Sequence, residues 1–181
     1  MNSLTRLAAA AAAMLTVLLL QATVIGPLSF PVPVSLPALT VVITAVYAGP
    51  GVGLGLGFAS GLLADLGSDH PAGVLALAWL SAGILGGTVG GLATQRGHGA
   101  RPVALLAAAI TTAATLLSGL MLAVLGSHGA TVAVVVRDEI PVFLGSAVLA
   151  LPLVPAVRAL LRSQGVAAAR PRAELVGRAG G

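Results

Sequence analysis

Asp65 is the residue with the clearest chemical potential, because it ends a long apolar segment. From Leu7 to Ala64 no side chain carries a formal charge. An acidic group within a membrane segment usually faces protein or water, and it often marks a functional position. Asp65 could also lie at the membrane surface, since Asp69 and His70 follow it closely. A functional position and an interfacial one therefore both stay open.

Other candidate catalytic groups lack the partners that a reaction needs. Residues Phe58-Ala59-Ser60-Gly61 resemble the Gly-x-Ser-Gly sequence of intramembrane serine proteases, but phenylalanine stands at the first glycine position. All three histidines fall in predicted loops, so none is placed to act as a base for Ser60. Within any one predicted helix, no pair of His, Asp or Glu residues has the spacing of metal ligands, and phosphate-loop and dinucleotide motifs are missing. The sequence predicts no catalytic residue, metal or cofactor.

Glycines at four-residue spacing form two series in the middle of the chain. The first series is Gly49, Gly53, Gly57 and Gly61, and the second is Gly83, Gly87 and Gly91, interleaved with Gly86 and Gly90. In a soluble helix each glycine costs roughly 1 kcal/mol relative to alanine. In lipid, small residues instead let two helix backbones approach closely. We expect the two segments to pack on each other, with a partner protein or ligand at one face as the alternative.

Composition places the chain among polytopic membrane proteins. Of its 181 residues 57% are hydrophobic and 8% are charged, and the mean hydropathy is +1.06. A typical soluble domain has roughly 25% charged residues. The absence of cysteine excludes disulfides and thiolate sites. The nine basic residues are all arginine and are read as topology signals rather than as a nucleic-acid surface. With only Arg137 outside, the positive-inside rule is satisfied and both termini are cytoplasmic.

The hydropathy pattern predicts an all-α protein with about six membrane helices. They are expected at residues 7–25, 36–48, 52–66, 72–94, 103–125 and 140–161. The second and third are shorter than the usual ~17–25 residues of a spanning helix, so they form either two short crossings or one re-entrant hairpin. Prolines in residues 26–37 predict an external loop or a partly embedded extended segment. Residues 132–136, of which four are β-branched valines, predict an extended approach to the membrane surface.

The chain is expected to form one membrane domain with a polar extension. Residues 1–162 are predicted to be a single polytopic domain, and residues 163–181 a disordered basic cytoplasmic tail. The tail could contact anionic lipid or only anchor the topology. Residues Arg137, Asp138 and Glu139, just before the last predicted helix, are read as an interfacial anchor with local ion pairing.

The glycine-rich segment resembles the rod shape-determining MreD family. That family carries a Gly-x-x-x-Gly-Phe-x-x-Gly-Leu-x-x-Asp stretch with another glycine shortly after it. The positions that match here are Gly53, Gly57, Phe58, Gly61, Leu62 and Asp65, followed by Gly73. Pro71-Ala72-Gly73 stands where the family often has Pro-Leu-Gly. The final helix, with Pro152 and Pro155 before a basic end, is also similar, and the remaining chain matches in hydropathy alone.

The resemblance implies a non-enzymatic scaffold of the bacterial cell-elongation machinery, multi-pass in the cytoplasmic membrane. Its implied partners are an MreC-like single-span protein, MreB, RodA and the transpeptidase partner of RodA, together with the lipid bilayer. The implied fold is similar to the membrane substrate-binding subunits of energy-coupling-factor transporters. Asp65 would place the external turn or contact a partner.

The main alternative is the membrane substrate-binding subunit of a vitamin importer. Ala9 and Ala13 have the small-residue spacing that such subunits use to dock a coupling protein. The aromatic content of 3% argues against it, because a vitamin pocket needs stacking and polar groups.

Overall fold

The computed structural model describes residues 3–25, 34–69, 71–95, 99–126 and 132–163. Within them the chain forms six α-helices and no strand. The helices are α1 (Ser3–Leu20), α2 (Leu36–Ala48), α3 (Pro50–Leu66), α4 (Val74–Gln95), α5 (Ala100–Val124) and α6 (Val132–Ser163), and a π-helical turn at Gln21–Ile25 continues α1. The predicted all-α class with six helices is confirmed. The predicted tail lies outside the described residues, except for Ser163 at the end of α6.

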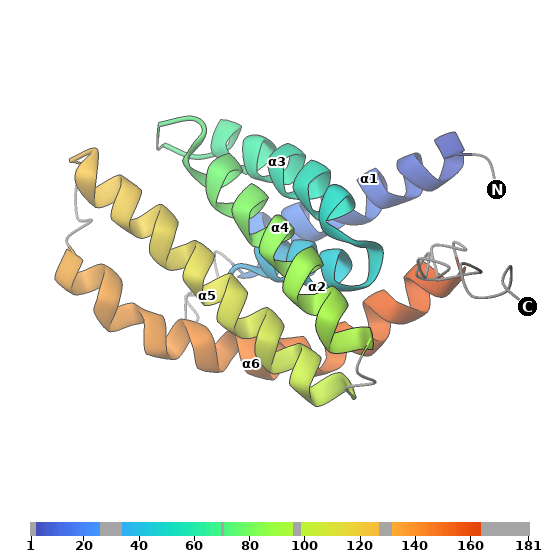
Figure 1. Ribbon diagram of the computed structural model, residues 1–181. Helices are drawn as coiled ribbons and strands as arrows, with labels where there is room; N and C mark the ends of the chain where they lie inside the picture. Colours follow the sequence, from blue (N-terminus) through green and yellow to red (C-terminus); the bar gives the residue numbers. More distant parts are fainter. Residues whose placement is uncertain (1–2, 26–33, 70, 96–98, 127–131, 164–181) are drawn as a thin grey trace, which may run out of the picture.

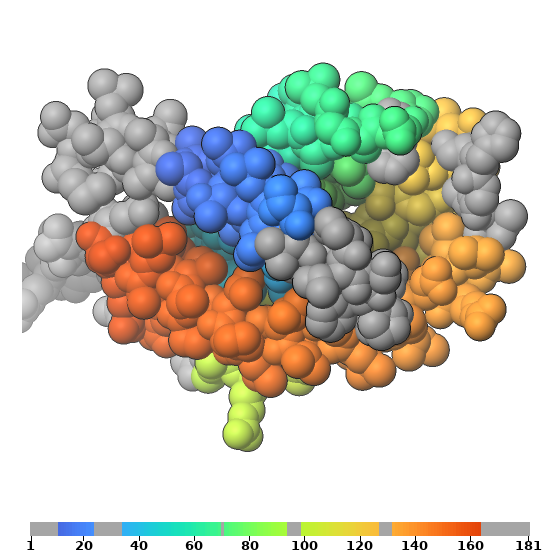
Figure 2. All heavy atoms as spheres, turned by 180° about the vertical axis from the view of Figure 1, so that it is seen from behind, coloured from blue at the N-terminus to red at the C-terminus, as the bar shows by residue number. Residues whose placement is uncertain are grey.

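The helices are arranged around α2 (Figure 1). α3 and α4 lie side by side, α5 lies against α4, and α6 lies against α5. Seen from behind, α1 lies between the α3–α4 pair and α6 (Figure 2). α4, α5 and α6 are each long and apolar enough to cross a membrane. The apolar helices α2 and α3, with 13 and 17 residues, are shorter.

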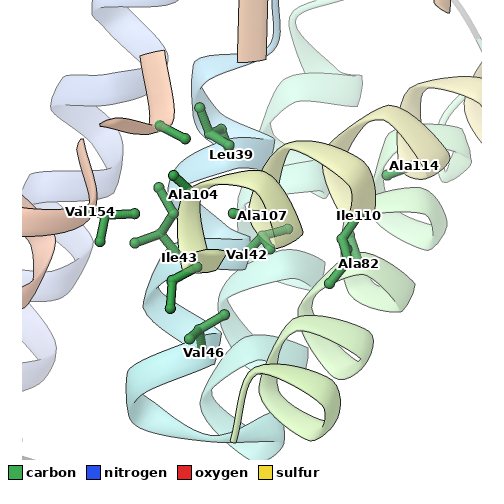
Figure 3. Close-up of a cluster of buried hydrophobic side chains, with 12 residues drawn as sticks. Leu39, Val42, Ile43, Val46, Ala82, Ala104, Ala107, Ile110, Ala114 and Val154 are labelled. Carbon is green, nitrogen blue, oxygen red and sulfur yellow. The ribbon is translucent and has the colours of Figure 1, made fainter. Parts of the chain in front are cut away.

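The largest buried apolar cluster is centred on α2, as Figure 3 shows. Leu39, Val42 and Ile43 have no exposed surface, and they meet small side chains of α5 such as Ala104 and Ala107. The close-packed interior favours burial of these aliphatic groups because dispersion contacts are made on every side. A helix that is apolar all round belongs in such a centre. The bounds of α2 agree with the predicted helix at 36–48.

A single residue, Gly49, joins α2 to α3. Its backbone has φ 94° and ψ 170°, a region that is essentially restricted to glycine. The Gly49 amide donates to the Ala45 carbonyl at 2.8 Å and so ends α2. Pro50 takes the first position of α3, where its missing amide hydrogen costs nothing. A Cβ at Gly49 would meet nothing within 4 Å, so glycine is needed here for the backbone conformation of the turn and not for space.

Gln21 ties the π-helical turn to the start of α2. Its Nε2 donates to the Val34 carbonyl at 3.1 Å, and its Oε1 accepts from the Leu36 amide at 3.1 Å. The Leu36 amide belongs to the first turn of α2, where backbone donors have no partner within the helix. One side chain therefore pairs with the open amide of Leu36 and with the Val34 carbonyl just before α2.

Replacing Gln21 by leucine should lower the free energy of unfolding by about 1–3 kcal/mol, because it leaves part-buried backbone groups without partners. The measurement is thermal unfolding of the purified full chain in detergent. Thr23→Val is the matched control, since the Thr23 hydroxyl donates only to Leu19 within its own helix. Equal losses in the two variants would show that the bridge to α2 contributes nothing.

The last helix begins at Val132, so the prediction of an extended segment at 132–136 is wrong. β-branched residues have a weak intrinsic preference against helix, and tertiary contacts routinely override it. Those contacts come from α5, where a Cβ at Gly119 would lie 2.7 Å from Cγ1 of Val135. Gly119 therefore lets this part of α6 pack closely on α5.

Two further features shape α6. Thr115 of α5 donates a hydrogen bond to Oε2 of Glu139 at 3.1 Å, so Glu139 is paired across the helix interface. Arg137 and Asp138, which were grouped with it as an interfacial anchor, are exposed. Pro141, Pro152 and Pro155 all lie inside the helix. Each proline removes a helical hydrogen bond, and α6 is visibly curved in Figure 1.

Candidate helix-packing and partner site

The first glycine series lies directly on the backbone of α4. A Cβ built at Gly53 would lie 2.7 Å from the carbonyl carbon of Gly83. At Gly57 it would lie 2.7 Å from the carbonyl carbon of Trp79, and at Gly61 it would lie 2.5 Å from Cα of Ala76. Carbon atoms in favourable contact are about 3.5–4.0 Å apart. No side chain fits at these three positions while α3 and α4 keep this separation.

α4 presents glycines to two different helices. A Cβ at Gly83 would lie 2.5 Å from the carbonyl carbon of Gly53, and Gly87 contacts Pro50 at the start of α3. Gly86 and Gly90 instead lie against Val42 and Val46 of α2. The interleaved glycines of the sequence therefore correspond to two packing faces, one toward α3 and one toward α2.

Gly91 continues the four-residue spacing of its series, but it does not take part in the contact between α4 and α3. A Cβ at Gly91 would meet no heavy atom within 4 Å, so its predicted place in the packing stripe is not supported. Residues four positions apart differ by about 40° around the helix axis, so a long series at this spacing gradually turns away from the face on which it began. In addition, α3 begins at Pro50, which already lies opposite Gly87, and no further turn of α3 is available beside Gly91.

Asp65 caps α4 from the end of α3. Its side chain is 2% exposed. Oδ2 accepts hydrogen bonds from the amides of Gly73 at 2.8 Å and Ala76 at 3.0 Å, and Oδ1 accepts one from Leu75 at 3.0 Å. The amides at the start of a helix have no helical partners and carry partial positive charge, so a carboxylate is the complementary group.

Asp65 caps α4 because the residue just before α4 has no side chain that could do so. Gly73 precedes the first residue of α4 and has no side chain, and its φ of 102° lies in the left-handed region that favours glycine. A residue from the preceding helix therefore takes the role that Ser, Thr, Asp or Asn usually plays at the N-cap. This geometry closes the turn between α3 and α4. The Asp65 side chain is thus buried within the protein and engaged by backbone amides.

Phe58 and Leu62 belong to the same motif but face away from α4. Their side chains are 48% and 37% exposed. The motif thus has two sides, with glycines and Asp65 on the inner side and two large apolar groups on the outer side. The inner side explains how α3 and α4 pack, and the outer side is available to lipid or to another chain.

The groups considered for catalysis are used in other ways. The Ser60 hydroxyl is buried and donates to the Leu56 carbonyl within its own helix. The two oxygens of Asp65 are engaged by amides. His70, His98 and His128 lie outside the described residues. Within the described part of the chain no group of three or more potential metal ligands occurs.

Sequence reasoning missed some of the residues that hold the site together. Gln21 belongs to no motif, and its two backbone partners, Val34 and Leu36, are more than ten residues away in the sequence. Gly119 carries no four-residue pattern, although it lies against Val135 of α6. A glycine in the middle of a long apolar helix was the one available signal for that contact.

A protein-family model described as rod shape-determining protein MreD matches residues 4–164 of the chain. The match includes all six α-helices apart from one residue at the start of α1. No curated protein and no solved structure matches the chain.

Proposed function

The chain belongs to the MreD family of rod shape-determining proteins, and from this premise we propose that it is a non-enzymatic scaffold of the bacterial cell-elongation complex. Family membership makes it a membrane component of rod shape determination. We further infer that it is a multi-pass protein of the cytoplasmic membrane with both termini in the cytoplasm. The arginine distribution supports this orientation.

One observation carries the scaffold proposal. The motif that matches the family builds a helix pair held backbone against backbone and closed by the buried Asp65 cap. Close packing over glycine fixes two helices without immobilising long side chains, whose lost rotamer freedom would oppose assembly. Such a pair is suited to holding a rigid surface toward other proteins. The described residues of this pair include no activated nucleophile or acid–base pair.

The proposed partners are an MreC-like single-span protein, MreB, RodA and the transpeptidase partner of RodA. We place the single-span partner at the outer side of α3, where Leu54, Phe58 and Leu62 are 44%, 48% and 37% exposed. A membrane helix can pack there through van der Waals contact, which drives helix association in lipid. A role in binding nucleic acid is not part of this proposal.

The double variant Phe58→Ala/Leu62→Ala should reduce co-purification of the MreC-like partner at least about tenfold, because large apolar anchors dominate interface energies. The measurement is quantitative capture from detergent of the tagged full chain expressed with that partner. Leu105→Ala is the control, since Leu105 is an equally apolar side chain of α5 that is 54% exposed. Unchanged capture by the double variant, with wild-type unfolding temperature, would remove α3 from the interface.

The vitamin-importer alternative makes a different prediction. A substrate-binding subunit would retain a radiolabelled vitamin through purification, and depletion of the chain would leave wall growth normal. The scaffold proposal predicts no retained vitamin and loss of rod shape on depletion. The Ala9 side chain, on which the importer reading partly rests, lies outside the described side chains.

A further inference from the structure

An aromatic ring and two arginines come together where α2 and α6 both end. Cζ of Arg158 lies 5.9 Å from the centroid of the Tyr47 ring, within the range of a cation–π contact. Arg162 lies one turn further along α6, so it shares a face with Arg158. The charges of both arginines act on the Tyr47 hydroxyl. Figure 2 shows this C-terminal part of α6, coloured orange-red, at the surface.

No described carboxylate is placed to neutralise these arginines. Asp65 lies in the last turn of α3 and Asp69 follows that helix, which leads away from Tyr47 for about 22 Å at ~1.5 Å per residue. Asp138 and Glu139 lie in the first turns of α6, about 29 Å along the helix from Arg158. The fifth acidic residue, Glu174, lies outside the described residues. Two exposed guanidinium groups at a helix end therefore present their hydrogen-bond donors outward.

We propose that Tyr47, Arg158 and Arg162 form a binding site for the phosphate headgroup of an anionic phospholipid. A guanidinium has a planar fork of donors that matches phosphate oxygens in pairs, and it is weakly hydrated. The ring of Tyr47 holds one guanidinium in place, and its hydroxyl suits the boundary between lipid and water. Basic groups between helix ends at the membrane surface are typical of such headgroup sites.

The rest of α6 supplies a surface for the acyl chains. Going from Arg158 toward the middle of the helix, Leu151 and Val148 are 50% and 66% exposed. A phospholipid whose headgroup lies at the arginines can lay its chains along these side chains. A free phosphate ion would contact the arginines alone. Contact with these apolar side chains therefore distinguishes a phospholipid from free phosphate.

The test is lipid selectivity of the purified full chain in mixed phosphatidylcholine and phosphatidylglycerol nanodiscs, read by native mass spectrometry after partial delipidation. The wild type should retain phosphatidylglycerol preferentially, and Arg158→Gln/Arg162→Gln should lower that enrichment about tenfold. Arg137→Gln, at the other end of α6, and a variant lacking residues 164–181 should both keep it. Retained enrichment in the double glutamine variant, or its loss in either control alone, would overturn the proposal.

A charge-conserving variant distinguishes a headgroup site from a topology signal. Arg158→Lys/Arg162→Lys keeps both positive charges but loses the planar forks and the stacking on Tyr47. We expect its enrichment to fall severalfold, and wild-type enrichment would mean that charge alone matters and that no built site exists. Inorganic phosphate should fail to displace the lipid at equal concentration. Displacement would assign the site to free phosphate and overturn the lipid proposal.

Discussion

Replacing Gly57 by alanine should destabilise the folded chain by more than about 2 kcal/mol, while the same replacement at Gly55 should leave stability unchanged or slightly higher. At Gly57 the new Cβ would lie 2.7 Å from the carbonyl carbon of Trp79 and 2.9 Å from the amide nitrogen of Leu80. At Gly55 it would meet nothing within 4 Å. Alanine is a better helix former than glycine by about 1 kcal/mol. A loss of stability at Gly57 must therefore come from packing against α4.

The pair of variants makes this comparison sharp, because both residues lie in α3 and the chemical change is identical. The measurement is the thermal unfolding temperature of the detergent-purified chain, together with the amount of folded protein that accumulates. Gly57→Leu and Gly61→Leu should fail to accumulate, since a leucine forces α3 and α4 apart. Equal stability of Gly57→Ala and Gly55→Ala would contradict the backbone contact between the two helices.

Asp65→Ala should lower the free energy of unfolding by about 3 kcal/mol or more, because it leaves three amides at the start of α4 without their acceptor. Hydrogen bonds to a charged group are worth roughly 1.5–3 kcal/mol each, and the Asp65 side chain is buried. Asp65→Asn should lie between the wild type and Asp65→Ala. Its amide keeps one acceptor oxygen but turns an NH₂ group toward an N–H donor.

The control for Asp65 is Asp69, four residues later in the turn that follows α3. Asp69 is exposed, so Asp69→Ala should change stability by no more than about 0.5 kcal/mol. Unfolding in detergent reports the cap, and capture of the MreC-like partner by the folded fraction reports any direct contact. If Asp65→Asn keeps wild-type stability and still loses the partner, the carboxylate acts in binding and not as a helix cap.

The sequence predicted the class and most helices because a membrane segment is defined by its own composition. α2 needed only an apolar run ended by Gly49-Pro50, and its bounds were correct. The predicted start of α6 was wrong because it rested on the local helix propensity of residues 132–136 alone. It did not include the contact with α5, where Gly119 leaves room for the Val135 side chain. In this segment the weak local preference against helix is opposed by tertiary contacts with α5. A single sequence shows the local preference but not the contacts.

The candidate site was predicted unevenly for a similar reason. Periodicity identified Gly53, Gly57 and Gly61 as one face, since spacing alone determines which residues share a face of a helix. It could not tell that Gly91 lies past the start of α3. The hydrogen-bond partners of Asp65 are backbone amides. Every residue except proline has one, so no sequence motif identifies these partners. The role of a buried carboxylate is therefore read from the fold that surrounds it.

Glycines that touch a backbone and glycines that touch a side chain should evolve under different rules. Gly57 touches main-chain atoms of Trp79 and Leu80, and no substitution at those positions can move these atoms out of the way. Gly119 of α5 touches the two Cγ atoms of Val135, which a mutation to alanine would remove. Second-site suppressors are thus open to a lesion at Gly119 and closed to one at Gly57. Across homologues, positions 119 and 135 are free to covary, while position 57 has no such freedom.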